Sequence, residues 1–425
     1  MRIVVTGMGV VAPNGVGLAD FEESLRKQRS GIRFLPELAD LKFGCQIGGI
    51  PAIDEATKQQ YFTELELKSL KASGVLYGVI AGQMAWEDAG LKTAAAVENE
   101  APDWDSGCIF GAGLAGAEVM RDATYLIDNM KVRRLGSTAV PQVMSSGISA
   151  FLGGKLGLGN QVSTNASACS TGTESILLAM SRIKAGLAKR MLCGACDSSG
   201  PYVWGGFDAM RVMTRKFNER PSAGSRPLSA TASGFVPGSG AGALVLESLE
   251  EAQARGAKIY GEVLGGAINS GGQRQGGTMT APNKQAIVRC IQQALANTGV
   301  KAQEIDAISG HLTSTMFDPA EVEQWCQALD RKGNDFPYIR SLKSMIGHCL
   351  SAAGAIESVA VILELYKGFL HGTINCEDLH PEVEKNIAVA SIPSQCLDVA
   401  PNIIAKSSFG FGDVNSCVIF KKYKS

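Results

Sequence analysis

Histidine and tryptophan are scarce in this sequence, with four copies of each among 425 residues, and aromatic residues make up only 6% of the chain. Neither sign of charge is in excess, because 40 lysines and arginines face 41 aspartates and glutamates. A formal net charge of -1 lacks the basic excess of nucleic-acid-binding and polybasic membrane-surface proteins. We therefore expect no nucleic-acid partner.

Long hydrophobic runs are also missing. No uninterrupted apolar stretch approaches the roughly 20 residues of a membrane-spanning helix. The apolar run in residues 2–12 is too short for a signal peptide and is interrupted by glycine. We expect a cytoplasmic protein without a membrane span.

The cysteines do not form the pattern of a disulfide scaffold. There are eleven, an odd number scattered along the chain, which favours reduced thiols in a cytoplasm. Cys193 and Cys196 have C-x-x-C spacing, but their apolar surroundings predict a buried strand, where alternation puts the two thiols on opposite faces. Neither a second pair nor a nearby histidine accompanies them. We expect no metal and no redox centre here.

The chain contains enough apolar sequence, 45% of its residues, for a large core and for more than one domain. Strand patterns alternate with helix patterns, which predicts an α/β architecture with largely parallel central strands. Similar strand–helix units lie on both sides of residue 255. The expected strands cover 2–12, 108–111, 191–196, 240–246, 258–267, 305–310, 402–406 and 415–421, and the expected helices 19–29, 65–89, 116–130, 141–156, 284–296, 318–329 and 347–370.

The first candidate for chemistry is Cys169, in a run of small residues that precedes a helical pattern. Ile176, Met180 and Ile183 recur at spacings of four and three, which is typical of one helix face. A thiol at a helix N-terminus meets unpaired N–H groups and the positive end of the dipole, which favour a nucleophilic thiolate. A small buried cysteine without a reaction accounts for this stretch equally well.

A glycine-rich turn at 111–116 matches G-x-G-x-x-G and stands between an expected strand and an expected helix. That context is the one in which a dinucleotide fingerprint occurs. The first strand–helix unit of the chain lacks the motif, however, and Asp122 and Asp128 fall inside the next helix instead of ending a second strand. Close backbone packing needs the same glycines, so an oxidoreductase remains the weaker alternative.

Two histidines stand at strand-to-helix transitions, as Cys169 does. His311 follows the strand predicted at 305–310, and His348 precedes a helix rich in glycine and alanine. In parallel α/β folds such ends converge on one crevice, where a thiol and two imidazoles would supply a nucleophile and proton-transfer groups. His371 and His380 lie in a loop region and are expected to be structural.

The segment 407–415 alternates two glycines with two aromatic side chains, Phe409 and Phe411. This pattern predicts a sharp loop that offers backbone N–H groups to an oxyanion and an aromatic ring to a pocket. A tight turn carrying two core aromatics would look the same.

Taken together, these residues resemble a β-ketoacyl-acyl-carrier-protein synthase of the chain-elongating class, in the thiolase superfamily. The resemblance runs essentially from end to end. Its motifs are Val4–Val11, Ala168-Cys169-Ser170, Ser225-Arg226-Pro227, Gly234-Phe235-Val236, Gly240-Ala241-Gly242, the segments around His311 and His348, and Phe409–Gly412.

The resemblance implies an acyltransferase with a two-halved thiolase fold, each half with a mixed sheet, layered α-β-α-β-α, and divided at 1–255 and 256–425. It implies that Cys169 accepts an acyl chain from acyl carrier protein, and that His311 and His348 assist decarboxylation of the malonyl unit. Lys343, held by Glu321, would act electrostatically. No cofactor is implied.

The resemblance also implies binding residues and partners. The N–H groups of Cys169 and Phe411 would form the oxyanion hole, with Phe411 as a gate. The partner would be an acidic acyl carrier protein, docked on Lys68, Lys71, Arg211, Arg215 and Lys216. A homodimer is expected, with a heterodimer as the alternative. The expected substrate-binding residues are Leu114, Phe207, Thr313, Thr315 and Phe409.

Two departures from the family pattern concern the site. Leu312 stands where a glycine usually follows the histidine, and Asp413 places a charge in the gating loop. Together they favour a divergent member that serves a specialised polyene or other secondary lipid. A catalytically silent partner subunit, similar to a chain-length factor, remains an alternative, although the presence of Cys169 disfavours it.

Overall fold

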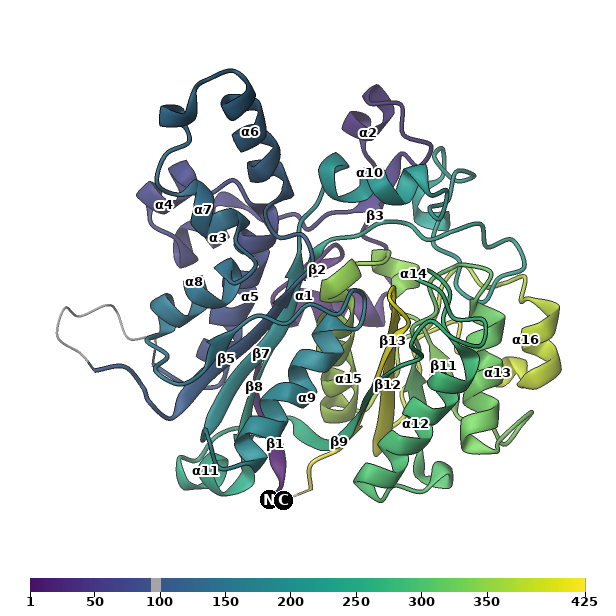
Figure 1. Cartoon of the computed structure of the whole chain (residues 1–425). Helices are drawn as coiled ribbons and strands as arrows, with labels where there is room; N and C mark the ends of the chain where they lie inside the picture. The colour runs from purple at the N-terminus through teal and green to yellow at the C-terminus, as the bar shows by residue number, and fades with distance from the viewer. Residues whose placement is uncertain (93–100, 425) are drawn as a thin grey trace.

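A large mixed β-sheet organises the computed structural model, which describes residues 1–92 and 101–424 (Figure 1). The strands are β1 (Ile3–Ala12), β2 (Gly15–Val16), β3 (Ile32–Phe34), β4 (Ile47–Gly49), β5 (Ser106–Ala112), β6 (Val162–Ser163), β7 (Arg190–Asp197), β8 (Gly240–Ser248), β9 (Gly261–Ser270), β10 (Ala307–Ser309), β11 (Tyr338–Arg340), β12 (Ile403–Gly410) and β13 (Val414–Lys421). Eleven of them form one sheet, in the order β11-β10-β12-β13-β9-β1-β8-β7-β5-β6, with β2 attached to β1.

The two halves of this sheet repeat the same topology. In the first half β1, β8 and β7 pair antiparallel, and β7, β5 and β6 pair parallel. In the second half β9, β13 and β12 pair antiparallel, and β12, β10 and β11 pair parallel. The halves join through a short antiparallel pairing of β1 with β9. The two expected sheets are therefore one continuous sheet, and the division at residue 255 stays a prediction.

The helices form three layers, one between the two halves of the sheet and one on the outer face of each half. They are α1 (Leu18–Arg26), α2 (Pro36–Asp40), α3 (Glu55–Tyr61), α4 (Glu64–Ser69), α5 (Ser73–Asp88), α6 (Ala117–Asp128), α7 (Ala139–Val143), α8 (Gly147–Leu156), α9 (Thr171–Lys184), α10 (Pro201–Ala209), α11 (Leu249–Ala254), α12 (Lys284–Thr298), α13 (Asp318–Leu329), α14 (Lys343–Ile346), α15 (Ala353–Lys367) and α16 (Pro381–Asn386). Helices α9 and α15 pack on each other between the halves, α5 and α8 cover the first half, and α12 covers the second (Figure 1). This is the expected α-β-α-β-α layering.

Close contact between the two central helices depends on glycine. A Cβ at Gly172 of α9 would lie 2.4 Å from the backbone nitrogen of Ala355 in α15. A Cβ at Gly354 would lie 2.4 Å from the hydroxyl of Thr173. Because glycine has no side chain at these two positions, the first turns of α9 and α15 approach closely. The residues that precede these turns are thereby brought together.

Several expected helices differ from the observed ones. Residues 65–89 form two helices, α4 and α5, because the side chain of Gln142 accepts the N–H groups of Lys71 and Ala72 and donates to the carbonyl of Ser69. These bonds satisfy a break in the backbone that the local pattern does not reveal. Residues 141–156 likewise divide into α7 and α8, and α15 begins at Ala353 instead of 347. The region 198–237, expected to be a loop, contains α10.

The remaining sequence expectations about cysteines and membranes can be compared directly. Each of the eleven cysteines is free. Cys193 and Cys196 belong to hydrophobic clusters on different sides of β7, as strand alternation predicts. Within residues 1–92 and 101–424, none of the helices is both long and apolar enough to cross a bilayer.

Candidate active site

Cys169 lies immediately before the first turn of α9, whose N-cap residue is Ser170. The preceding residue, Ala168, adopts a left-handed backbone with φ of 47°, a strained turn that projects the thiol away from the helix. Burial raises the pKa of the Cys169 thiol to about 11, although Lys343 and nearby N–H groups act in the opposite direction. The expectation of a thiolate is therefore wrong for the free protein near pH 7: desolvation outweighs the helix dipole, and the thiol is neutral.

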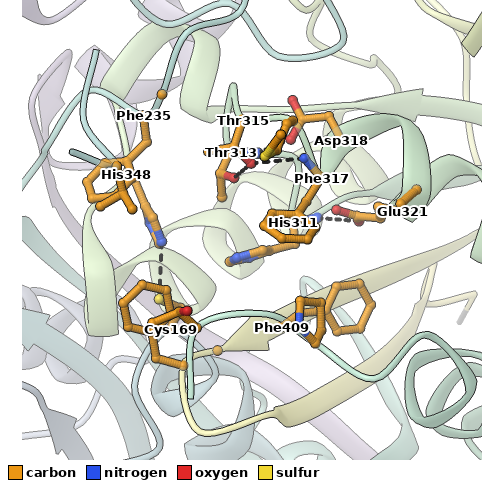
Figure 2. A pocket seen from close by; sticks show the side chains of 18 of the residues that line it. Cys169, Phe235, His311, Thr313, Thr315, Phe317, Asp318, Glu321, His348 and Phe409 are labelled. Atoms are coloured by element: carbon orange, nitrogen blue, oxygen red, sulfur yellow. Dashed lines mark hydrogen bonds between the residues drawn. The ribbon is translucent and has the colours of Figure 1, made fainter. Parts of the chain in front are cut away.

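The two histidines meet this thiol from the other half of the molecule (Figure 2). The Nε2 atom of His348 lies 3.2 Å from the Sγ atom of Cys169, and the rings of His311 and His348 stand edge to face at 5.4 Å. Ligand atoms of all three side chains lie within 4.8 Å of one another. Burial and the charge of Lys343 hold the pKa of both imidazoles well below the usual value, so both are neutral near pH 7.

The repeat in the sheet explains why these segments converge. Cys169 follows β6 and precedes α9, and His348 follows β11 and precedes α15, which are the equivalent positions in the two halves. His311 follows β10, whose equivalent in the first half, β5, leads into the glycine-rich turn at 111–116. Cys169 and His348 are therefore related by an internal symmetry of the fold.

The loop between β12 and β13 completes the surroundings of the thiol. The backbone N–H of Phe411 is directed at Cys169, as is the N–H of Cys169 itself, and both favour negative charge there. The ring of Phe411 lies 6.0 Å from that of Phe207, and the ring of Phe409 lies 6.0 Å from that of His311. This arrangement provides two donors for an oxyanion beside an aromatic wall.

Glu321 does not hold Lys343, and that expectation is corrected by the structure. The carboxylate of Glu321 accepts the backbone N–H groups of His311 and Leu312, both at 2.7 Å, and thereby fixes the loop that carries His311. Burial raises the pKa of Glu321 to about 7. Lys343 instead forms a fully buried ion pair with Glu357, 2.5 Å from Nζ to Oε1. The spacing of these residues in the sequence does not show whether Glu321 or Glu357 pairs with Lys343.

A pocket of about 410 Å³ opens above the three side chains. Thr313 and Thr315 stand on one wall with their hydroxyls 3.0 Å apart. Lys284 and Arg211 add positive charge to the lining. The apolar lining residues include Phe207, Val212, Phe235, Ile287, Leu350, Phe409 and Phe411.

Leu114 and Leu312 do not contribute side chains to this pocket. The expectation for Leu114 is wrong within this chain, because its side chain is 52% exposed and its backbone N–H is held by the carboxylate of Asp197. Leu312 is fully buried in the core of the second half, with an unusual φ of 20° that Glu321 supports. The departure at Leu312 therefore changes the loop backbone and leaves the pocket lining unaffected.

The glycine-rich turn at 111–116 is filled by protein. A Cβ at Gly111 would lie 2.1 Å from the Thr171 side chain, and one at Gly116 would lie 2.1 Å from a backbone carbonyl. These two glycines serve close packing against protein atoms, which accounts for the motif without a bound dinucleotide. A thiol and two imidazoles are also the donors that zinc prefers. Among the described residues, however, neither the Nδ1 atom of His311 nor that of His348 has the hydrogen-bond partner that orients a metal-binding histidine. We therefore assign neither a dinucleotide nor a zinc ion to this protein.

Three further residues belong to the site and were not found from the sequence. Asp318, whose pKa burial raises to about 6, accepts the N–H groups of Thr313 and Ser314. Its position in the first turn of α13 was the available signal. Glu357 and Lys406 lie inside apolar segments, and no pattern marked them.

His371 and His380 are structural as expected: the Nδ1 of His371 contacts the carbonyl of Gly372, and His380 caps α16.

The five basic residues expected to dock a carrier protein divide into two groups. Arg211 lines the pocket, and Arg215 and Lys216 are exposed in the same loop. Lys68 belongs to α4 and Lys71 follows it, and α4 is separate from α10 in Figure 1. The ammonium group of Lys71 lies 3.4 Å from Asp122, which partly neutralises it.

A doubled mixed sheet around two central helices, with a thiol facing two neutral imidazoles, defines a class: thiolase-fold acyltransferases. The Beta-ketoacyl synthase N-terminal domain matches residues 1–252, and the Beta-ketoacyl synthase C-terminal domain matches residues 260–377. The chain belongs to the β-ketoacyl synthase family.

Curated relatives match along the whole chain. The 3-oxoacyl-acyl-carrier-protein synthase 2 of Synechocystis sp. is 32% identical and is aligned over 100% of this chain and 98% of its own length. The chloroplastic synthase II of Arabidopsis thaliana is 33% identical, over 100% of this chain and 76% of its own.

Solved structures show the same fold. A β-ketoacyl synthase from Burkholderia phymatum has a TM-score of 0.88 at 26% identity, with 100% of both chains covered. The ishigamide ketosynthase/chain length factor has a TM-score of 0.87 at 27% identity, covering 100% of this chain and 99% of that one. A type II PKS ketosynthase in complex with its acyl-carrier protein has a TM-score of 0.85 at 28% identity, covering 99% of both.

Proposed function

We propose that this protein catalyses a decarboxylating Claisen condensation, joining an acyl group carried on Cys169 to malonyl-acyl carrier protein and giving 3-oxoacyl-acyl carrier protein. One observation carries the proposal: a neutral thiol lies 3.2 Å from a neutral imidazole of His348, with a second imidazole and the N–H of Phe411 at the same apolar pocket. The names of the relatives support the same reaction.

In the first half-reaction Cys169 attacks the acyl thioester. Because the resting thiol is neutral, its proton passes to Nε2 of His348 as the S–C bond forms. The oxygen of the tetrahedral intermediate receives the N–H groups of Cys169 and Phe411. Removing one such donor typically costs about 10²–10³ in rate. Collapse of the intermediate releases the carrier thiol, which takes up the proton.

In the second half-reaction the malonyl thioester occupies the same pocket and loses CO₂. The electron pair of the breaking C–C bond forms an enolate, whose oxygen is stabilised by hydrogen bonds from the neutral imidazole of His311 and from that of His348, which has by then taken the Nε2–H tautomer. The enolate carbon then attacks the acyl carbonyl on Cys169 and expels the thiolate. Thr313 and Thr315 would hydrogen-bond the pantetheine arm, and Phe207 and Phe409 would contact the acyl chain or its entrance, since all four line the pocket.

We propose a homodimer as the functional form, with a heterodimer as the alternative. Strand β6 lies at an edge of the sheet, which is an open site for strand pairing. Apolar side chains are exposed on the same half, around α6 and α7, and a second subunit would cover them. They are Leu114, Met120, Tyr125, Val140 and Met144.

The free cysteines support the prediction of a reducing compartment, the cytoplasm.

The proposal is tested by incubating the protein with a panel of acyl carrier proteins and measuring its mass. We expect an acyl adduct on Cys169, transfer to malonyl-acyl carrier protein, and no adduct on a Cys169→Ala variant. Absence of an adduct with every chain length would favour a silent partner subunit, which is the second candidate. Faster turnover of polyenoic than saturated chains would support a specialised pathway, and the reverse would contradict it.

A further inference from the structure

Two lysines share one buried glutamate beside the active site. The Nζ atom of Lys343 lies 2.5 Å from Oε1 of Glu357, and the Nζ atom of Lys406 lies 2.8 Å from Oε2 of the same carboxylate. None of the three side chains is more than 1% exposed. An unpaired charge is costly to bury, so Glu357 is expected to pair with one cation. The second lysine is not needed for that pairing.

The cluster holds one positive charge in excess, because two ammonium groups face one carboxylate. Burial opposes the ionisation of Glu357, yet both lysines together keep the pKa of that carboxyl below its usual value. Burial lowers the pKa of Lys406, and Glu357 counteracts this effect. Glu321, whose pKa burial raises to about 7, is a further acid that acts on Lys406.

Lys406 is also connected to the segments that carry the nucleophile and the aromatic loop. Its ammonium group donates to the hydroxyl of Ser408 at 2.9 Å, and that hydroxyl contacts the hydroxyl of Thr173 in α9 at 2.8 Å. The carbonyl of Ser408 accepts the hydroxyl of Ser170, the residue after Cys169. One side chain therefore links α15, β12 and the first turn of α9.

We propose that Lys406 is a positioning residue for the reaction: by sharing Glu357 with Lys343 it maintains a net positive charge beside the two imidazoles and fixes β12 against the start of α9. This inference rests on the proposed function for its catalytic consequence. The excess charge keeps His348 unprotonated, so that it can accept the thiol proton, and it favours the anionic enolate.

The charged groups that act on the imidazoles come from several elements. Lys343 of α14 and Lys406 of β12 both lower the pKa of His311 and His348, whereas Glu357 of α15 offsets the lysines. The remaining groups are Glu321 of α13, whose carboxylate binds the N–H of His311, the Cys169 thiol before α9, and Asp197 of β7, which acts on that thiol. Removing Lys406 leaves Lys343 and Glu357 as a neutral pair.

The test exploits the scarcity of histidine, since four side chains give four resolvable NMR signals in protein labelled with ¹³C at histidine. In a Lys406→Met variant we expect the titrations of His311 and His348 to move to higher pH by about one unit. The acid limb of acyl transfer to Cys169 should move in the same direction. Lys406→Arg keeps the charge and should restore both readouts.

A matched control removes a buried cation elsewhere. Arg340 pairs with Glu364, both fully buried, and lowers the pKa of His371. Arg340→Met should therefore shift His371 alone. Unchanged titrations of His311 and His348 in Lys406→Met, or an equal shift of them in Arg340→Met, would overturn the inference. The titrations need no substrate, so they are informative even if no acyl transfer is found.

Discussion

Asp413 anchors the turn that carries Phe411, and its removal should release that turn. The carboxylate accepts the backbone N–H groups of Asn283 at 2.8 Å and Gln273 at 3.0 Å. It lies against Gly271 and Gly277, where a Cβ would come within 2.1 and 2.4 Å of its Oδ2 atom. Asp413 is 1% exposed and has a left-handed φ of 62°. The charge in this loop is thus a specific attachment to residues 271–283.

The magnitude of an Asp413→Gly substitution follows from these contacts. Two hydrogen bonds to a buried carboxylate contribute about 3–6 kcal/mol together. Glycine relieves about 1 kcal/mol of left-handed strain but adds about 0.5–1 kcal/mol of backbone entropy. The two backbone effects nearly cancel, so the turn loses at least about 3 kcal/mol of stability. This loss corresponds to roughly a hundredfold increase in the population of the open turn.

Hydrogen exchange of peptides covering 271–283 and 407–415 measures this opening. We expect exchange to become about a hundredfold faster, and acyl transfer to Cys169 to slow about tenfold because the N–H of Phe411 loses its position. Asp330→Gly is the matched control: Asp330 is exposed with φ of 52° at the end of α13. Exchange in Asp413→Gly that equals the wild-type rate would refute the anchoring role.

Three further predictions concern the site. Because burial raises the pKa of the Cys169 thiol to about 11, alkylation by iodoacetamide should accelerate about tenfold per pH unit from pH 7 to 9.5; a plateau in this range would contradict the neutral resting thiol. His348→Asn should slow acyl transfer about a hundredfold, whereas His311→Asn should retain acyl transfer and lose malonyl decarboxylation; loss of both steps in both variants would argue against separate roles. Reversing the charges of Arg215 and Lys216 together should raise the KM for acyl-acyl carrier protein about tenfold and leave the use of acyl-CoA unchanged; equal KM values would remove these residues from the docking surface.

The convergence of Cys169, His311 and His348 was predictable from the sequence because each lies next to a local signal. Cys169 precedes a helical pattern, and His311 and His348 stand where a strand pattern gives way to a helix. The ends of parallel strands meet at one edge of a sheet, so such residues are expected to converge. The same reasoning could not assign Glu321 and Glu357 to their partners, since both lie on helices and the choice depends on which helix packs against Lys343.

Other features were decided by contacts between distant segments. The break between α4 and α5 depends on the amide of Gln142, and the protonation of Cys169 depends on desolvation that no local motif measures. The family resemblance implies that Leu114 lines the acyl pocket, yet within one chain it lies at the surface.

The sequence by itself determined the fold class and predicted that Cys169, His311 and His348 lie together, because hydrophobic periodicity and turn residues act over a few positions of the chain. Only the tertiary structure decided the charge state of these groups and the network of Lys343, Glu357 and Lys406. Electrostatic energies depend on burial and on distances between segments, and both are set by how the two halves pack around α9 and α15.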